Sequence, residues 1–266
     1  MHPGTRHREA VIDVLREAGG RILLPAFSEQ AATAATKPDG SVVTETDLLC
    51  QAFIRERLHA LDPEIRFLGE EMTESEQRAC LQQGGLFWCV DPLDGTSNFT
   101  ASFPCFASTV ALIEHGRPVL ACTHDPVRDE TFDAIEGGGA RLNGTVIRAS
   151  ATHAIRQSIG FIDFKRLPAA LAGRLAGDRH YRSQRNIGSC ALEWAWLAAG
   201  RGQFIIHGGE KLWDYAAGCL LVEEAGGIVS DFEGRHPFAA SRLTSSIVAG
   251  ANPKVHAALL AMLGND

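Results

Sequence analysis

The sequence has 266 residues, of which 45% are hydrophobic and 21% are charged, and its formal net charge is −7. This composition is typical of a folded protein with a sizeable core. The acidic balance and the lack of a basic run exclude bulk electrostatic binding to nucleic acid or to acidic membranes, so we expect no direct contact with either.

The cysteines and the apolar stretches point to a reducing compartment. The seven cysteines form no C-x-x-C pair, and their odd number and their places within apolar runs favour reduced core thiols. There is no N-terminal apolar segment of the signal-peptide type, and no apolar stretch reaches the ~18 residues that suggest a membrane span. We therefore expect a cytoplasmic protein.

Two helices are predicted near the N-terminus. Apolar residues recur at helical spacing over residues 6–18, and a second helix is predicted over residues 48–61. Thr44 and Asp47, just before the second helix, have the spacing of a capping box. Taken alone, Asp47 would be a helix cap.

The first acidic motif follows a short strand. Ile65 and Phe67 indicate the strand, and Gly69 releases the chain so that Glu70 sits at its end. By itself this motif reads as a solvated acidic turn.

The second acidic motif is the most informative stretch of the chain. Residues 86–90 are an apolar run that predicts a buried strand, and Asp91 and Asp94 follow in a turn closed by Gly95. Two carboxylates at a strand end can share a hard cation such as Mg²⁺. Thr96, with the next residue, is expected to cap a helix whose free N–H groups suit an anion such as phosphate. An ordinary Asp-rich turn is the alternative.

The remaining chain alternates strands and helices without repeats. A hairpin is predicted over residues 107–114 and 118–124, and a strand over 131–135. In the second half, strands are predicted at 155–161, 203–206 and 227–231, and helices at 168–176, 191–200, 214–225 and 253–263. Asp214 falls in the first turn of its helix, where an Asp commonly serves as a cap.

Taken in order, these segments resemble the inositol monophosphatase family of metal-dependent, lithium-sensitive phosphatases. The resemblance runs from about residue 5 to the end of the chain. Its strongest motifs are Lys37 with the Val-Thr-x-x-Asp47 run, Gly-Glu70-Glu, Asp91-Pro-Leu-Asp94-Gly-Thr-Ser-Asn-Phe and Trp-Asp214-Tyr-Ala-Ala-Gly. Weaker matches are Asp125-Pro126, Gly137-Gly-Gly-Ala140, Asn143-Gly144 and Gly188-Ser-Cys-Ala-Leu192.

The resemblance implies a mixed α/β (α+β) fold, layered as an α-β-α-β-α sandwich with two sheets. It implies one catalytic domain over residues 1–266, with most metal ligands in residues 1–150 and Asp214 and the specificity region in residues 151–266. It also implies a homodimer. The pattern of elements alone supports only a mixed α/β protein.

The family's ligand set carries over residue by residue. It implies one Mg²⁺ on Glu70, Asp91 and the carbonyl of Leu93, and a second on Asp91, Asp94 and Asp214. A third, more weakly bound ion would be held by Glu70 and water molecules. All these ligands are hard oxygen atoms, which fits Mg²⁺ better than zinc.

The implied reaction is direct attack of a metal-activated water on a phosphate monoester. Glu70 and the Thr96 hydroxyl would orient this water, and Asp47 would accept the Thr96 proton. The backbone N–H groups of Gly95 and Thr96 would hold phosphate oxygens. The expected substrate contacts come from Asp94, Gly95, Thr96, Ser189, Cys190, His207 and Asp214.

The substrate is less determined than the reaction. Inositol phosphatases of this family usually carry a Glu seven residues before the Trp-Asp aspartate, and this chain has His207 there. Glu210 or a shifted loop is one possible source of the missing acid. We expect a small polyol or sugar phosphate. Histidinol phosphate, fructose 1,6-bisphosphate and 3′(2′),5′-bisphosphate nucleotides are alternatives, and a role as a binding partner of a transcription or RNA-processing complex is an alternative of another class.

Overall fold

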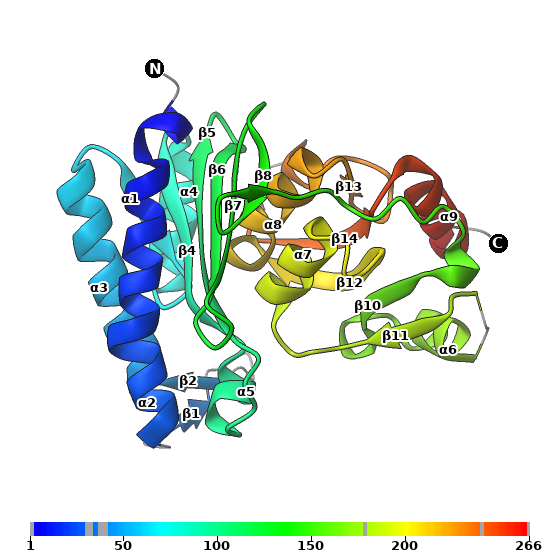
Figure 1. Cartoon of the computed structure of the whole chain (residues 1–266), viewed down its shortest axis with the longest axis horizontal. Helices are drawn as coiled ribbons and strands as arrows, with labels where there is room; N and C mark the ends of the chain where they lie inside the picture. Colours follow the sequence, from blue (N-terminus) through cyan, green and yellow to red (C-terminus); the bar gives the residue numbers. More distant parts are fainter. Residues whose placement is uncertain (1–2, 30–33, 37–41, 178–179, 240–241, 265–266) are drawn as a thin grey trace.

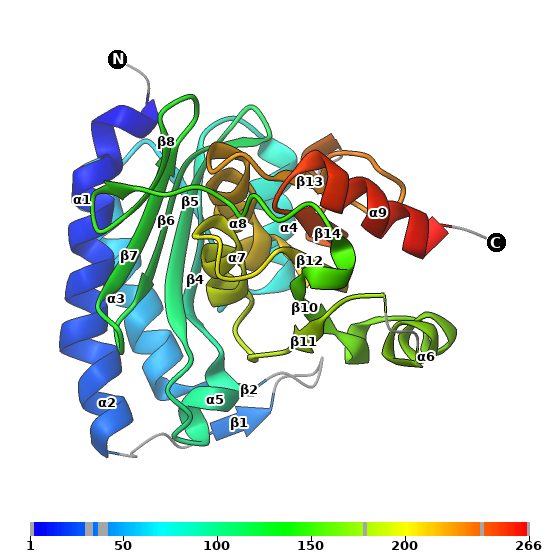
Figure 2. The same ribbon diagram turned by 45° about the vertical axis from the view of Figure 1, so that its right-hand side comes forward.

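The computed structural model describes residues 3–29, 34–36, 42–177, 180–239 and 242–264. Lys37, which belongs to the first motif, lies outside the described residues. Two sheets and three helical layers alternate as α-β-α-β-α, which confirms the expected architecture (Figures 1 and 2). Within the described ranges, no helix is both long and apolar enough to cross a membrane.

The first helical layer covers the outer face of the larger sheet. It contains α1 (Pro3–Ala18), a π-helical turn η1 (Gly19–Leu23), α2 (Leu24–Glu29) and α3 (Glu45–Leu61). The apolar face of α1, including Val11 and Leu15, is fully buried against the sheet together with Ile54 of α3. A two-stranded sheet of β1 (Ala34–Thr36) and β2 (Val42–Thr44) leads into α3.

The larger sheet has seven strands in the order β3-β4-β5-β6-β7-β8-β9. Its strands are β3 (Arg66–Gly69), β4 (Phe87–Asp94), β5 (Ala107–Glu114), β6 (Arg117–Asp125), β7 (Glu130–Ile135), β8 (Gly139–Leu142) and β9 (Thr145–Val146). Only β3 and β4 pair in parallel; the other neighbours are antiparallel. The parallel pair brings the ends of β3 and β4, and hence both acidic motifs, to one edge of the sheet.

The middle layer consists of α7 (Cys190–Ala198) and α8 (Leu212–Glu224), which pack against each other between the two sheets (Figure 1). Helix α4 (Glu74–Gln83) contributes to the same apolar cluster through Cys80. The two helices approach closely because Gly218 has no side chain: a Cβ there would lie 2.2 Å from Cγ of Trp194.

The second sheet has five strands in the order β11-β10-β12-β14-β13. They are β10 (Ile159–Asp163), β11 (Ser183–Arg185), β12 (Phe204–Lys211), β13 (Ile228–Ser230) and β14 (Thr244–Gly250). Helices α6 (Ala169–Gly177) and α9 (Pro253–Gly264) form the outer layer, and their apolar residues pack on the sheet in a cluster that includes Phe204 and Val248. Short 3-10 turns are η2 (Ile155–Gln157), η3 (Phe164–Arg166) and η4 (Pro237–Ala239).

Several predicted boundaries differ from the structure. The strand predicted at 155–161 is wrong in its first half, because the chain forms η2 there and β10 begins only at Ile159. The acids Asp91 and Asp94 lie within β4, which runs through most of the predicted turn and ends at Asp94. Helices α2 and α4 and strands β1, β2, β8, β9, β11 and β14 were not predicted from the sequence. The prediction of a single catalytic domain, with two halves that meet near residue 150, stays a prediction.

The close contact at Gly218 generates the first prediction. Gly218→Ala should lower the free energy of unfolding by about 1–3 kcal/mol, because the overlap with the Trp194 ring outweighs the smaller gain in helix propensity. Gly173→Ala in α6 is the matched control, since a Cβ there would meet nothing within 4 Å. It should leave stability unchanged or raise it by up to about 1 kcal/mol. Denaturant unfolding of both variants measures this, and equal stability would contradict the packing argument.

Candidate metal centre

Asp91 and Asp94 face the same side of the larger sheet because β4 contains an irregularity between them. Asp91 pairs with Thr109 of β5 and Asp94 with Ala107, so the two residues of β4 between these pairs oppose a single residue of β5. Since side chains alternate along a regular strand, residues three apart would otherwise face opposite sides. The extra residue therefore turns both carboxylates toward the middle helical layer.

Asp214 completes the group from α8. It lies in the first turn of that helix, as predicted, and its Oδ2 accepts a hydrogen bond of 3.3 Å from the Lys211 N–H. One carboxylate oxygen from each of Asp91, Asp94 and Asp214 lies within 4.8 Å of the others. Strand β4 thus brings two ligand candidates from the first half of the chain to a third from the second half.

Glu70 lies beside this group at the end of β3. Its N–H donates to the carbonyl of Val90 at 3.1 Å, so the chain is held against β4 as it leaves the strand. Its carboxyl interacts with that of Asp91. The two acidic motifs, about twenty residues apart in the sequence, therefore meet because β3 and β4 run in parallel.

Burial and mutual repulsion disfavour the charged forms of these acids. Burial, followed by the charges of Glu70, Asp94 and Asp214, raises the pKa of Asp91 well above its usual range. Burial likewise raises the pKa of Asp214 well above that range. Burial raises the pKa of Asp94 to about 7, although hydrogen bonds from Ser189 and Ala191 oppose the shift.

This donor set fits a divalent cation. The three aspartates offer only hard oxygen atoms, and like charges this close need counter-charge to remain ionised together. Cysteine and histidine, which softer metals prefer, are absent from the grouped ligands among the residues the structure describes. The observed chemistry therefore fits Mg²⁺ or Ca²⁺ rather than zinc.

Thr96 and Asp47 are also brought together. The Thr96 hydroxyl lies 3.0 Å from Oδ1 of Asp47 and 3.1 Å from the carbonyl oxygen of Leu93. Asp47 also completes a capping box with Thr44, whose N–H donates to Oδ2 of Asp47 at 2.8 Å. Asp47 is fully buried, so the cap and the contact with Thr96 are two uses of one carboxylate.

Gly95 sits where β4 turns into the short helix α5 (Thr96–Thr100). Its φ of +94° is in the left-handed region, and a Cβ would lie 2.9 Å from the carbonyl oxygen of Cys105. Gly95 is the N-cap of α5, so the expectation that Thr96 caps this helix is wrong. Thr96 is instead its first residue, where its N–H remains outside the helical hydrogen bonds.

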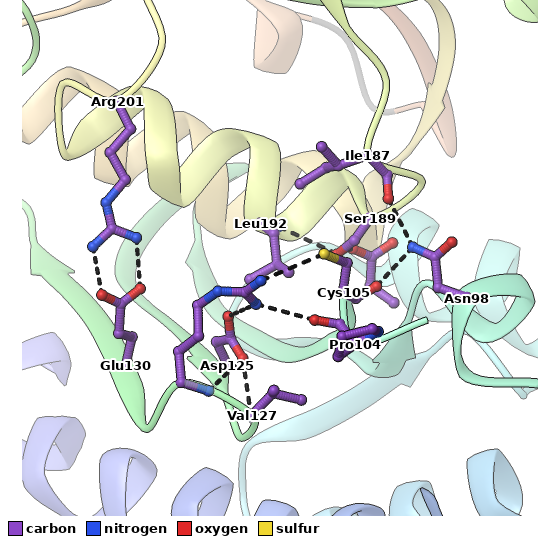
Figure 3. A network of polar contacts seen from close by, with 12 residues as sticks. Asn98, Pro104, Cys105, Asp125, Val127, Glu130, Ile187, Ser189, Leu192 and Arg201 are labelled. Carbon is purple, nitrogen blue, oxygen red and sulfur yellow. Dashed lines mark hydrogen bonds and ion pairs between the residues drawn. The ribbon is translucent and has the colours of Figure 1, made fainter. Parts of the chain in front are cut away.

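The start of α7 supports Asp94. Ser189 caps α7 and its hydroxyl donates to Oδ2 of Asp94 at 2.5 Å, while the Ala191 N–H donates to the same oxygen at 2.7 Å. Asn98 fixes the adjoining loops, because its amide donates to the carbonyls of Cys105 and Ile187, each at 2.7 Å (Figure 3). Ser189 therefore lies next to the acidic group, and its hydroxyl is already hydrogen-bonded to Asp94, one of the candidate metal ligands.

Cys190 and His207, two of the expected substrate contacts, have side chains that are occupied within the protein. Burial, with the charges of Glu210 and Asp94, raises the pKa of the Cys190 thiol well above its usual value, so it stays protonated. His207 is 5% exposed; its Nδ1 accepts from the Gly209 N–H at 3.2 Å and its Nε2 lies 3.5 Å from Oδ2 of Asp163. Both ring nitrogens thus have partners within the protein.

The sequence reading did not connect Asp163 with His207, nor assign a partner to Glu210. Asp163 pairs with His207 across the parallel strands β10 and β12. Glu210 is 1% exposed and accepts a hydrogen bond of 2.8 Å from Nε1 of Trp194. The Gly-Gly pair before Glu210 was the available signal, because adjacent glycines within a strand often mark a bulge.

Comparisons with known proteins agree with this geometry. The sequence model of the inositol monophosphatase family matches residues 6–265. The chain is 36% identical over 274 residues to Nus factor SuhB of Escherichia coli, covering 100% of this chain and 97% of that protein. It is 34% identical over 205 residues to a fructose-1,6-bisphosphatase/inositol-1-monophosphatase of Thermotoga maritima, covering 76% and 75% of the two chains.

A solved structure shows the same fold. The crystal structure of extragenic suppressor protein suhB from Bartonella henselae superimposes with a TM-score of 0.85 at 29% identity. The match covers 97% of this chain and 98% of the other.

The raised pKa of Asp94 predicts how the metal-free protein responds to pH. The folded state holds the Asp94 proton more tightly than the unfolded state, so this contribution to stability is complete below pH ~4 and is lost as pH rises to about 7. Asp94→Asn removes the loss and keeps an oxygen for Ser189 and Ala191. With a chelator present, the variant should gain stability over wild type by up to roughly 4 kcal/mol across that range.

Thermal or denaturant unfolding at several pH values measures this difference. Saturating Mg²⁺ should reverse it by stabilising wild type more than the variant, since binding to the native state alone shifts the equilibrium. A stability difference that stays constant with pH in chelator would contradict the account of Asp94.

Proposed function

The chain belongs to the inositol monophosphatase family, and we propose that it is a metal-dependent phosphomonoesterase acting on a small polyol or sugar phosphate, resembling inositol 1-phosphate. The observation that carries the proposal is the convergence of Asp91, Asp94 and Asp214 within 4.8 Å, in a buried setting that disfavours three negative charges. A site that needs cations and faces helix N-termini suits an anionic substrate.

We assign the ions to the ligands that the family resemblance implies. Asp91 would bridge one Mg²⁺, held with Glu70 and the carbonyl of Leu93, and a second, held with Asp94 and Asp214. A third ion would depend on Glu70. Bound divalent cations neutralise the charge of a phosphate ester and lower the pKa of water at the site. Lithium sensitivity, expected for a site of this kind, belongs to the same proposal.

The remaining residues would bind and orient. Glu70 and the Thr96 hydroxyl orient the attacking water, and Asp47, 3.0 Å from that hydroxyl, accepts its proton. The N–H groups of Gly95 and Thr96 hold phosphate oxygens. The protonated thiol of Cys190 is a poor nucleophile, which favours direct attack of water over a covalent intermediate.

Substrate identity rests on the leaving-group side, formed in this proposal by Ser189, Cys190 and His207. His207 replaces the usual Glu, and its ring nitrogens face Gly209 and Asp163, so its influence on a substrate would be through shape and through Asp163. Fructose 1,6-bisphosphate deserves a place in any substrate panel because the Thermotoga maritima relative is named for that activity. Histidinol phosphate and bisphosphate nucleotides complete the panel.

A second candidate function follows from the name of another relative. The chain matches Nus factor SuhB over its whole length, which supports a role as a binding partner of a transcription or RNA-processing complex. A homodimer and a cytoplasmic location stay predictions. Co-purification with a catalytically inactive variant separates the two functions, because a binding role persists without turnover and a purely enzymatic role does not.

The proposed function is tested by phosphate release. With Mg²⁺, the wild-type protein should hydrolyse at least one member of a panel of polyol, sugar, amino-alcohol and nucleotide monoesters, and a chelator should abolish this. Asp91→Asn should lower kcat by at least about 10³-fold, because it removes the charge proposed to bridge two ions. Asp129→Asn, an exposed residue with φ of 52°, is the matched control and should keep full activity. Activity of Asp91→Asn near that of wild type would contradict the metal assignment.

The proton relay generates a separate prediction. Thr96→Ala should lower kcat by about 10²–10⁴-fold with little change in KM, because it removes an orienting hydroxyl and no substrate contact. Asp47→Asn should give a similar loss, and the double variant should lose little more, since the two residues act together. Glu76→Gln alters an equivalent capping box on α4 and should leave kcat unchanged. If the losses of the two single variants were fully additive in the double variant, Asp47 would act only as a helix cap and not with Thr96.

A further inference from the structure

Glu210 reaches the middle layer through a second strand irregularity. On β12, His207 pairs with Ile247 of β14 and Glu210 with Ser245, so the two residues of β12 between these pairs oppose a single residue of β14. Without the extra residue, side chains at 207 and 210 would face opposite sides of the sheet. With it, Glu210 faces α7 and α8, the same layer that Asp91 and Asp94 face from the other sheet.

One oxygen of the Glu210 carboxylate is satisfied and the other is not. Oε1 accepts the hydrogen bond from Trp194 Nε1 at 2.8 Å. The Cys190 thiol interacts with the carboxylate, but across the described part of the chain no donor meets hydrogen-bond geometry at Oε2. A buried carboxylate oxygen without a partner is costly, so its retention calls for a ligand.

Glu210 is connected to the elements that hold two of the candidate metal ligands, Asp94 and Asp214. Trp194, its partner, belongs to α7, and the first turn of α7 donates two hydrogen bonds to Asp94. Lys211, the next residue in the chain, donates its N–H to Asp214.

We propose that Glu210 is a positioning residue of the metal centre: its charge adds to that of Asp94 and Asp214, and Oε2 accepts a hydrogen bond from the hydration shell of the divalent cation. This inference rests on the proposed metal centre. The ligand class is a hydrated divalent cation, because an unpartnered carboxylate oxygen that faces the same helical layer as the three aspartates attracts positive charge and its water donors.

A structural role for Glu210 makes a different prediction. If the carboxylate only joined β12 to α7, its loss would weaken the fold and leave cation affinity unchanged. As a positioning residue for a cation, it costs stability while the cation is absent, because an uncompensated buried charge is unfavourable. Removing that charge should therefore stabilise the metal-free protein and weaken metal binding, which are effects of opposite sign.

The test compares wild type with Glu210→Gln, which preserves size and an oxygen for Trp194. Mg²⁺ affinity is measured by calorimetric titration of the full chain and by the Mg²⁺ dependence of Tm, and no substrate is needed. We expect Mg²⁺ to bind about 10–100-fold more weakly to the variant, as for other residues that support metal ligands. The Tm in chelator should be equal to or above that of wild type.

Glu193→Gln is the matched control. Glu193 is a buried carboxylate on α7 that already accepts the Ile187 N–H at 2.8 Å. Its substitution should weaken Mg²⁺ binding less than Glu210→Gln does. Equal affinity of wild type and Glu210→Gln, or equal losses in the two variants, would overturn the role of Glu210. Failure of wild type itself to bind Mg²⁺ would instead overturn the proposed metal centre.

Discussion

The repulsion among three neighbouring carboxylates, two of them buried and one partly buried, is the constraint on which the rest of the structure depends. Asp91, Asp94 and Asp214 lie within 4.8 Å of one another, and burial raises the pKa of each. A protein gains nothing in stability from such an arrangement without counter-charge. The acids meet at the helical layer between the two sheets. We therefore take this group, which needs a positively charged ligand, as the candidate functional site.

The surrounding architecture serves to hold these acids together. A bulge in β4 turns Asp91 and Asp94 to one side, and a second bulge in β12 turns Glu210 toward the same layer from the other sheet. Because Gly95 has no side chain, Ser189 at the start of α7 can lie close to the end of β4; a Cβ at Gly95 would be 3.3 Å from Cβ of Ser189. Because Asp214 and α7 come from the second half of the chain, the candidate site requires both sheets in place, which links folding to function.

Much of this could be predicted from the sequence, for identifiable reasons. The apolar periodicity of α1 and α3 and the continuous apolar run of β4 are local signals, and the ordered acidic motifs identified the family and its layered fold. Helical periodicity placed Asp214 in the first turn of α8, and its contribution to the site was implied only by the family resemblance. Helix α4 was missed because its exposed residues are nearly all polar, and β14 because its signal is weak beside neighbouring serines.

Features that depend on tertiary packing could not be predicted. The bulge in β4 leaves little trace in the sequence, so the common orientation of Asp91 and Asp94 was not apparent. The two glycines before Glu210 indicate a bulge in β12, but the direction in which Glu210 then points depends on strand register. The pairing of His207 with Asp163 depends on two strands that are neighbours only in the folded sheet. Pattern reading identifies which residues carry chemistry, whereas strand pairing decides which of them meet.

The most direct test of the central claim is a crystal structure grown with Mn²⁺ in place of Mg²⁺, with anomalous differences collected to locate the ions. The account predicts anomalous peaks within coordination distance, about 2.0–2.6 Å, of Asp91 together with Asp94 and Asp214, and a further peak between Asp91 and Glu70. Clear density for the unaltered aspartates with no anomalous peak at saturating Mn²⁺ would contradict it.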